Sequence, residues 1–498
     1  MNDVTPINKT PLSKRVLVVG WLVGLAVSLI LILTRSHALN FGNALLAIAI
    51  AGVGLAPSLY YLAQSPKQRE VIPVMALTGL FYAVFFGLSA FGSGYLITPG
   101  QPGIQFYKGV WVPEISVKAQ LLGLVGISAM IGVWGVLRPI LSRRVPVVPL
   151  VFDITSHRER RALVGLAWVL ALSNIAYWHV PFVRQLPSVG QLLQPAGFAA
   201  FAIFYIFWRR RELSRGQIVS YFWISLPVWL MGIVGSGLIT GVILVLVFAL
   251  AVNLGITGRI PWKLPLASLV VVLLVYPHLE DYRNQSWQTG DAIQKLDPSA
   301  NVVERVVGLV IFVAKKTRTD GLGSKKRDEV PFDRLVRRIS HILMFTHVVQ
   351  STPSQVPFWD GATYRTLITG WVPRIVWPEK PEERWGNAFG NRYGILGASD
   401  PHMSVNIPWM TELYANYGAR GVVLGMAMIG IFMALVDRLI NSPGASLASS
   451  AIAAAALFPL FYQESNFTVM TGSLPPLILA LWIFFRYGLA LWCRYDRP

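Results

Sequence analysis

Long apolar runs dominate this sequence and limit the folds that are open to it. Hydrophobic residues make up 54% of the chain and charged residues only 13%. Several runs reach the roughly 20 apolar residues that a helix needs to cross about 30 Å of hydrocarbon. They predict an all-α polytopic membrane protein with about twelve spans. The expected spans are residues 16–33, 41–63, 71–97, 116–137, 162–180, 192–208, 217–235, 238–256, 264–279, 418–436, 450–470 and 474–492.

One long polar segment interrupts this pattern and divides the chain into three parts. We expect a membrane bundle of about nine spans in residues 1–277, a loop domain in residues 278–409, and about three further spans in residues 410–498. Two apolar stretches of the loop, residues 302–314 and 332–349, are too short or too interrupted to span comfortably. They are predicted to be helices that lie at the membrane interface.

Basic residues indicate the orientation of the chain, because lysine and arginine concentrate in short cytoplasmic loops. Clusters such as Arg143-Arg144 and Arg209-Arg210-Arg211 all lie on one side of the predicted topology. Both termini are therefore expected in the cytoplasm and the long loop on the periplasmic or extracellular side. This topology suits a multi-pass protein of the bacterial cytoplasmic (inner) membrane.

The net charge of +19 does not indicate a nucleic-acid partner. Much of it follows from the topology rule, and anionic lipid headgroups attract the same side chains. Residues 278–409 hold 17 basic against 14 acidic residues, so the loop is only slightly positive. Membrane lipids are the partner that this charge predicts.

The last third of the loop interleaves tryptophans with basic residues. Indole rings suit the interfacial aromatic belt, but their flat apolar faces also suit the C–H faces of sugars. Arginine binds phosphate oxygens in bidentate fashion, although surface ion pairs with Glu379, Glu382 and Glu383 are an equal alternative. The pattern suggests a ligand with sugar at one end and phosphate at the other. The candidate ligand-binding residues are Arg365, Arg374, Lys380, Arg384, Arg392, Trp371 and Trp377.

Three titratable residues are candidates for acid–base chemistry. His402 lies just before a span, where a neutral imidazole could take a proton from a sugar hydroxyl. Glu464 lies inside a predicted span, where a carboxylate is costly and thus a functional candidate; its structural alternative is a buried pair with Arg420. Glu412 is nearer to water and could favour a helix start. No Asp-x-Asp pair occurs, so a divalent metal and other cofactors are not expected.

Two stretches together resemble a known family. WVPRIVWPEKP, residues 371–381, and TELYANYGARGVVLGMAMIG, residues 411–430, are similar to the bacterial oligosaccharide repeat-unit polymerases, also called O-antigen polymerases. Those proteins commonly carry an arginine-proline-tryptophan-lysine stretch in an outer loop, and a glutamate with an asparagine-aromatic-glycine at the next span. The order of His402, Asn406, Glu412, Gly418 and Gly421 also resembles the related O-antigen ligases.

The resemblance implies a metal-independent glycosyltransferase of GT-C-like architecture. It would join oligosaccharide repeat units carried on undecaprenyl pyrophosphate into an O-antigen, capsule or exopolysaccharide. A chain-length regulator protein would be a further partner. Arg374 and Arg392 would bind the pyrophosphate, with Arg365 and Lys380 as second choices, and Arg384 and Arg420 would also contact substrate. His402 would be the base, with Glu412 or Glu464 as substitute or orienting group.

Two other functions remain open at this point. A ligase would move a finished glycan to a lipid or protein acceptor from the same kind of donor. A non-enzymatic flippase or transporter would carry the same lipid, and it predicts ionisable groups or broken helices near the middle of the membrane. The scarcity of charge within the predicted spans favours an enzyme over the transporter.

Overall fold

The computed structural model describes residues 40–65, 68–70, 72–96, 103–107, 110–146, 156–235, 239–257, 261, 266, 306–312, 314–315, 336–382, 384–397, 403–443 and 445–495. In these residues the protein is predominantly helical. The predicted span 16–33 lies outside the described residues, and of the predicted span 264–279 only residue 266 is described. A small antiparallel sheet pairs β1 (Ile104–Tyr107) with β2 (Val110–Val112), with Ile104 opposite Val112.

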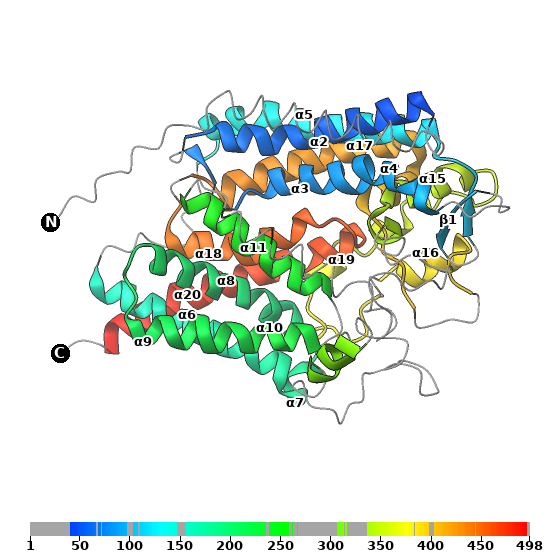
Figure 1. Cartoon of the computed structure of the whole chain (residues 1–498). Helices are drawn as coiled ribbons and strands as arrows, with labels where there is room; N and C mark the ends of the chain where they lie inside the picture. Colours follow the sequence, from blue (N-terminus) through cyan, green and yellow to red (C-terminus); the bar gives the residue numbers. More distant parts are fainter. Residues whose placement is uncertain are drawn as a thin grey trace.

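The first group of long helices packs side by side along the upper part of Figure 1. It consists of α2 (Phe41–Ala63), α3 (Val74–Tyr82), α5 (Val117–Arg144) and α17 (Trp409–Ile440). A π-helical segment, Ala83–Leu88, continues α3 into α4 (Ser89–Gly92) and the 3-10 turn Ser93–Leu96. At Gly430, a Cβ atom would come within 2.4 Å of the Met130 carbonyl oxygen, so the absence of a side chain allows α17 to approach α5.

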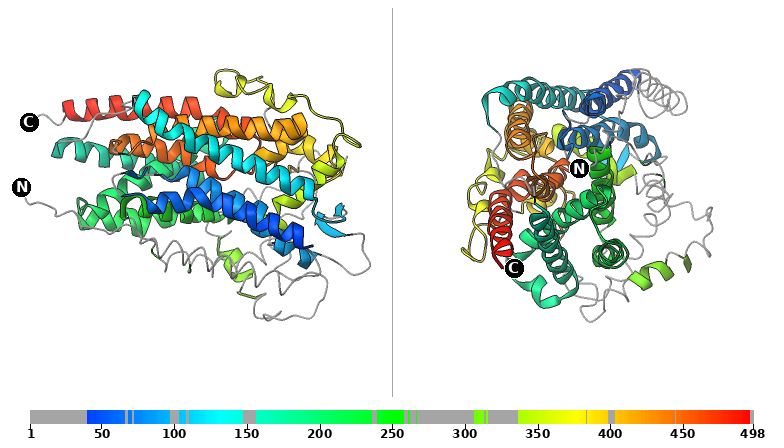
Figure 2. Two further views of the ribbon diagram at one scale, coloured as in Figure 1. Left: turned by 90° about the horizontal axis from the view of Figure 1, so that it is seen from above. Right: turned by 90° about the vertical axis from the view of Figure 1, so that its left-hand side faces the viewer.

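The second group lies beside the first. Its long helices are α6 (His157–His179), α8 (Val189–Arg209), α11 (Ile239–Thr257) and α20 (Leu474–Tyr495). Shorter members are α7 (Pro181–Gln185), α9 (Arg215–Ile218), the π-helical segment Val219–Ser225, α10 (Leu226–Gly235) and α18 (Leu447–Leu457). Viewed along their axes, the helices of both groups run in similar directions (Figure 2, right).

Local sequence sets several helix starts. Ser156 and Glu159 form a reciprocal capping box at the start of α6. The side chains of Asn40, Ser116 and Ser446 accept the N–H of the residue three positions later, at α2, α5 and α18. Each cap satisfies a backbone donor that the first helical turn leaves free, so these boundaries follow from polar residues between apolar runs.

The described loop residues from 341 onwards gather at one end of the helices, which we call the loop end (Figure 1). They form α15 (His341–Ser351), α16 (Gly386–Arg392) and two 3-10 turns, Ala362–Tyr364 and Thr369–Trp371. Nine of the eleven residues of α15 are buried. The prediction of an interfacial helix at residues 332–349 is therefore wrong for α15, because its neighbours bury most of its polar side chains as well as its apolar ones and leave only Gln350 of this helix exposed. Of residues 302–314, only 306–312 and 314 are described.

Eight of the described helices are long and apolar enough to cross a membrane. They fall on the predicted spans between residues 41 and 235 and on the predicted spans 418–436 and 474–492. The predicted span 238–256 corresponds to a shorter apolar helix, Gly241–Thr257. The predicted span 450–470 is not one helix: α18 and the turn Phe458–Phe461 end before residues 462–466, and α19 (Phe467–Gly472) follows.

A second break occurs near the start of α17. Gly418 has φ 63° and ψ −151°, a conformation that is essentially restricted to glycine. The Ala415 carbonyl loses its helical partner there, and the N–H of Trp359 donates to it instead at 3.0 Å. Gly418 therefore bends the helix and lets the loop bond to it.

Candidate functional site

A buried polar network occupies the break that follows α18. Glu464 is 3% exposed and contacts three side chains that come from distant parts of the sequence. Its Oε2 atom lies 2.5 Å from Arg338 Nη2 and 2.7 Å from Asn406 Nδ2, and its Oε1 atom lies 3.0 Å from His341 Nε2. We call these four residues the His341–Glu464 network.

The break explains why Glu464 can occupy this position. Residues 462–466 leave the helical path between the turn Phe458–Phe461 and α19, so the carboxylate turns towards α15 and the residues that precede it. Arg338 and His341 are three positions apart, and together they hold both carboxylate oxygens. The Tyr462 hydroxyl accepts a second hydrogen bond from Arg338 Nη2 at 3.2 Å.

The imidazole of His341 is enclosed on one side by aromatic rings. The ring centroids of Phe81, Phe85 and Phe86 lie 5.8, 5.0 and 6.2 Å from it. These phenylalanines belong to the middle of the span Val74–Gly92. His341 Nδ1 is buried and has no hydrogen-bond partner among the described residues. When Nε2 donates to Glu464, Nδ1 is left with a lone pair that can accept a proton.

Glu412 lies in a separate buried position in the first turn of α17. It is 1% exposed, and its Oε2 atom accepts the N–H of Phe467 at 2.7 Å. The interpretation that Glu412 is near water is therefore wrong: the carboxylate joins α17 to the start of α19. Asn416, one turn later, donates to the Thr363 hydroxyl at 2.9 Å and so ties the loop to the same helix.

The two arginines predicted to bind pyrophosphate face carbonyl groups of their own loop. Arg374 donates to the carbonyl oxygens of Pro378, Lys380 and Pro381. Arg392 donates to the carbonyl oxygen of Pro357 at 2.7 Å and to that of Phe358, and its guanidinium lies 4.9 Å from the ring of Trp359. In this conformation both side chains brace the loop.

The other predicted binding residues divide by exposure. Lys380 is buried, with its Nζ atom 3.5 Å from the Gly370 carbonyl oxygen. Arg420 is exposed and is not the partner of Glu464, since Arg338 and His341 hold that position. His402 lies outside the described residues. Apart from Arg374 and Arg392, the predicted binding residues that are exposed are Arg365, Arg384, Arg420, Trp371 and Trp377.

Comparison with known proteins identifies a family without a named function. Residues 158–487 match the family described as Domain of unknown function (DUF8712), and this is more than half of the 498 residues. The chain belongs to this family. No curated protein and no solved structure matches it. The region matched to DUF8712 contains all four residues of the His341–Glu464 network.

Sequence reasoning missed most of this network. His341 and His347 lie six positions apart, a spacing that does not place them on one helical face, and His347 bonds to the Tyr393 carbonyl oxygen instead of joining the network. A usable signal was nonetheless present. A lone carboxylate in an apolar run requires a cation, and Arg338 with His341 offers two candidates at helical spacing. Among the described residues, no group of three or more His, Cys, Asp or Glu could hold a metal ion.

Proposed function

We propose that this protein is a glycosyltransferase that polymerises undecaprenyl-pyrophosphate-linked oligosaccharide repeat units at the outer face of the bacterial cytoplasmic membrane. The observation that carries the proposal is the imidazole of His341, which a buried carboxylate orients and whose second nitrogen is unpartnered. A carboxylate that fixes the tautomer and orientation of a histidine is a recurrent arrangement for general-base catalysis.

The reaction is a substitution at an anomeric carbon. The acceptor hydroxyl oxygen forms a bond to that carbon while the bond from the carbon to the pyrophosphate oxygen breaks, and the pyrophosphate leaves with the electron pair. The acceptor proton passes to His341 Nδ1, and the resulting imidazolium is stabilised by Glu464 through Nε2–H. Arginine donors can stabilise the negative charge that develops on the leaving group.

The reaction also requires side chains that can contact the sugar rings and the pyrophosphate, and exposed side chains are available for both. Trp371 is 49% exposed and Trp377 is 41% exposed, so an indole face of each is accessible to a sugar ring. The side chain of Arg338 is one-third exposed despite its contact with Glu464, so it can also meet an anionic group. Arg365, Arg384 and Arg420 are exposed and can meet phosphate without breaking loop contacts.

Replacing His341 with Gln tests the proposal. Purified protein is incubated with a lipid-linked oligosaccharide, and the products are separated by size. The wild type is expected to give a ladder, and the variant is expected to lose roughly 10²- to 10⁴-fold in rate, the usual contribution of a general base. His347→Gln is the matched control on α15 and should retain the ladder. A ladder of undiminished rate with His341→Gln rejects the assignment of the base.

A second function is favoured by one specific observation. The His341–Glu464 network lies beside the middle of the span Val74–Gly92, next to two interrupted helices, and a lipid-linked oligosaccharide transporter predicts such a site. The same preparation in proteoliposomes distinguishes the two functions: a transporter moves labelled lipid between leaflets without changing its size. A ligase would instead transfer one finished glycan to an added acceptor.

A further inference from the structure

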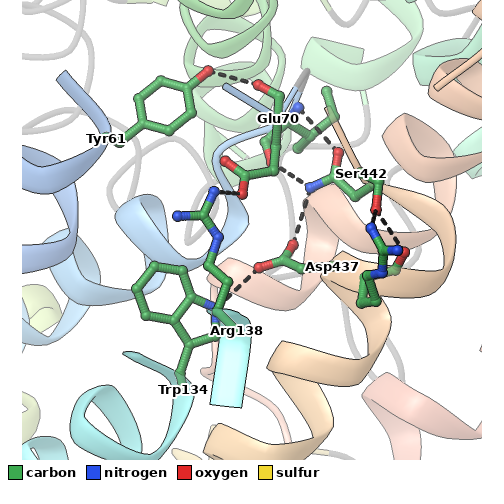
Figure 3. A network of polar contacts seen from close by, with 9 residues as sticks. Tyr61, Glu70, Trp134, Arg138, Asp437 and Ser442 are labelled. Atoms are coloured by element: carbon green, nitrogen blue, oxygen red, sulfur yellow. Dashed lines mark hydrogen bonds and ion pairs between the residues drawn. The ribbon is translucent and has the colours of Figure 1, made fainter. Parts of the chain in front are cut away.

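A second buried charged network lies at the end of the helices opposite the loop end. It joins the segment between α2 and α3 to α5 and α17 through three charged residues, Glu70, Arg138 and Asp437 (Figure 3). Glu70 is 6% exposed and Asp437 is 8% exposed. We call these three residues the Glu70–Asp437 network.

Arg138 is committed to one of the two carboxylates. Its Nη2 atom donates to Glu70 Oε1. The guanidinium also lies against two aromatic rings, 5.3 Å from the centroid of Tyr60 and 5.4 Å from that of Trp134. This packing limits the freedom of the guanidinium to turn towards another acid.

Asp437 is held by neutral donors. Its Oδ2 atom accepts from Trp134 Nε1 at 3.1 Å, and its Oδ1 atom accepts from Asn441 Nδ2 at 3.0 Å. Among the described residues, no lysine, arginine or histidine nitrogen lies within 4.0 Å of its carboxylate. Asn441 also bonds to both the N–H and the carbonyl oxygen of Ile72, which joins Asp437 to the same segment as Glu70.

The charges in this network do not balance. Two carboxylates share one guanidinium, and a buried set with one excess negative charge is strongly disfavoured unless it is neutralised. We propose that Glu70 and Asp437 form a proton-binding site that holds one proton between them near neutral pH, and that this proton keeps Glu70 and Ile72 docked on α5 and α17. The proposal does not depend on the glycosyl-transfer reaction.

Two further observations agree with a bound proton. Burial raises the pKa of Glu70 to about 7, and the nearby charge of Asp437 raises it as well, whereas Arg138 lowers it. The residues Glu70, Arg138, Asp437 and Trp134 line a cavity. Its volume of about 10 Å³ is close to the space that one water molecule needs. A water there would connect the two acids to the edge of the network.

Among the residues that the structure describes, the other ionisable groups around the site do not supply the missing cation. Arg69 donates to the Leu62 carbonyl oxygen and lies over the ring of Tyr61, and Arg438 donates to the Val145 carbonyl oxygen. The Tyr61 hydroxyl donates to the backbone carbonyl oxygen of Glu70. Loss of the shared proton would therefore leave an uncompensated charge beside Glu70 and Ile72 and weaken their attachment to α5 and α17.

Infrared spectroscopy of the full-length protein in detergent or nanodiscs tests the proposal. A protonated carboxyl has a C=O stretching band that shifts in D₂O and disappears on ionisation. We expect such a band in the wild type at about pH 6 and its loss by about pH 9. Either E70Q or D437N should remove it, because the remaining carboxylate then balances Arg138. Glu379→Gln, at an exposed loop carboxylate, is the control and should keep the band.

Two results would overturn the proposal. One is a wild-type spectrum without a titrating carboxyl band in this range. The other is a band that persists in both E70Q and D437N, since its proton would then belong to another acid. The wild-type titration needs no variant, so a failure of either variant to fold leaves the test intact.

Discussion

The two buried networks contain similar residues but differ in charge balance. In the His341–Glu464 network, one carboxylate meets one arginine and one histidine, and each of its oxygens has a donor. In the Glu70–Asp437 network, two carboxylates meet one arginine, and Asp437 bonds only to neutral groups. The first can remain ionised, whereas the second is stable when it holds a proton.

This difference shows that the same side chain has opposite consequences in different surroundings. Removing one partner of a buried ion pair destabilises the folded protein, because the other charge is left uncompensated. In a buried site with excess negative charge, neutralising one carboxylate stabilises the folded protein. Glutamate-to-glutamine substitutions, which preserve shape, therefore distinguish the two networks directly.

The largest effect is expected from Glu464→Gln. The variant leaves Arg338 without its partner and His341 without the group that orients it. We expect product formation to fall roughly 10²- to 10⁴-fold, as for loss of the base itself. Stability should fall by about 1–3 kcal/mol, less than for a fully buried pair because Arg338 reaches solvent. Product ladders and thermal unfolding in detergent measure the two quantities, and a variant with wild-type activity would refute the role of the pair.

Glu70→Gln should have the opposite effect on stability. The pKa of Glu70 is raised to about 7 in the folded protein from its usual 4.5. Below about pH 4.5 the residue is protonated in both states; between that value and about pH 7 only the unfolded state releases the proton, so stability falls as pH rises. The shift corresponds to about 3 kcal/mol.

We expect the Glu70→Gln variant to lose this dependence and to be at least as stable as the wild type at about pH 8. Thermal unfolding of both proteins at a series of pH values measures the pH dependence of stability. Glu379→Gln, which removes an exposed carboxylate, should keep the wild-type slope. A variant that is less stable than the wild type at every pH would mean that both networks are ordinary ion pairs, and the contrast between them would disappear.

A smaller effect, on stability alone, is expected from Gly418→Ala. A side chain at φ 63° costs about 1–3 kcal/mol, and the new Cβ atom would lie 3.0 Å from the ring of Phe358. The break at Gly418 shapes the loop end, so the variant should leave the pH dependence due to Glu70 unchanged. Gly132→Ala, at an open position of α5, is the matched control, and it should be neutral or slightly stabilising.

The smallest effect is expected from Arg374→Ala. Its donors serve loop carbonyls at a partly exposed position, so we expect a loss of about 1 kcal/mol or less and near-normal product. The amount of product ladder that Arg374→Ala forms is compared with the amount that Glu464→Gln forms. If Arg374→Ala abolishes the ladder as completely as Glu464→Gln, Arg374 binds the pyrophosphate as the sequence predicted, and the loop changes conformation to allow it.

Much of the fold was predictable from hydropathy. Most described spans coincide with predicted runs, because crossing a membrane requires a continuous apolar segment of known length. The exceptions are informative. Residues 450–470 form an apolar run that the structure divides before α19, and residues 341–351 form a helix enclosed by others. Hydropathy reports the affinity of a segment for an apolar environment, but it does not distinguish lipid from protein.

The candidate site was less predictable. The sequence singled out Glu464 because a carboxylate within an apolar run is costly wherever the run lies. It could not identify Arg338, His341 and Asn406 as its partners, since these residues lie more than fifty positions away and meet it only because a helix is interrupted. It also could not show that Glu70 and Asp437 share one arginine.

The sequence by itself therefore determined that this chain is predominantly helical, that it has apolar helices long enough to cross a membrane, roughly where most of these helices lie, and that Glu464 is exceptional. These properties depend on local composition and on the transfer of each segment from water to an apolar phase. Only the tertiary structure decided which charges balance. Charge balance depends on distances between side chains that are remote in sequence, and in a medium of low dielectric constant one unpaired charge changes the state of the whole network.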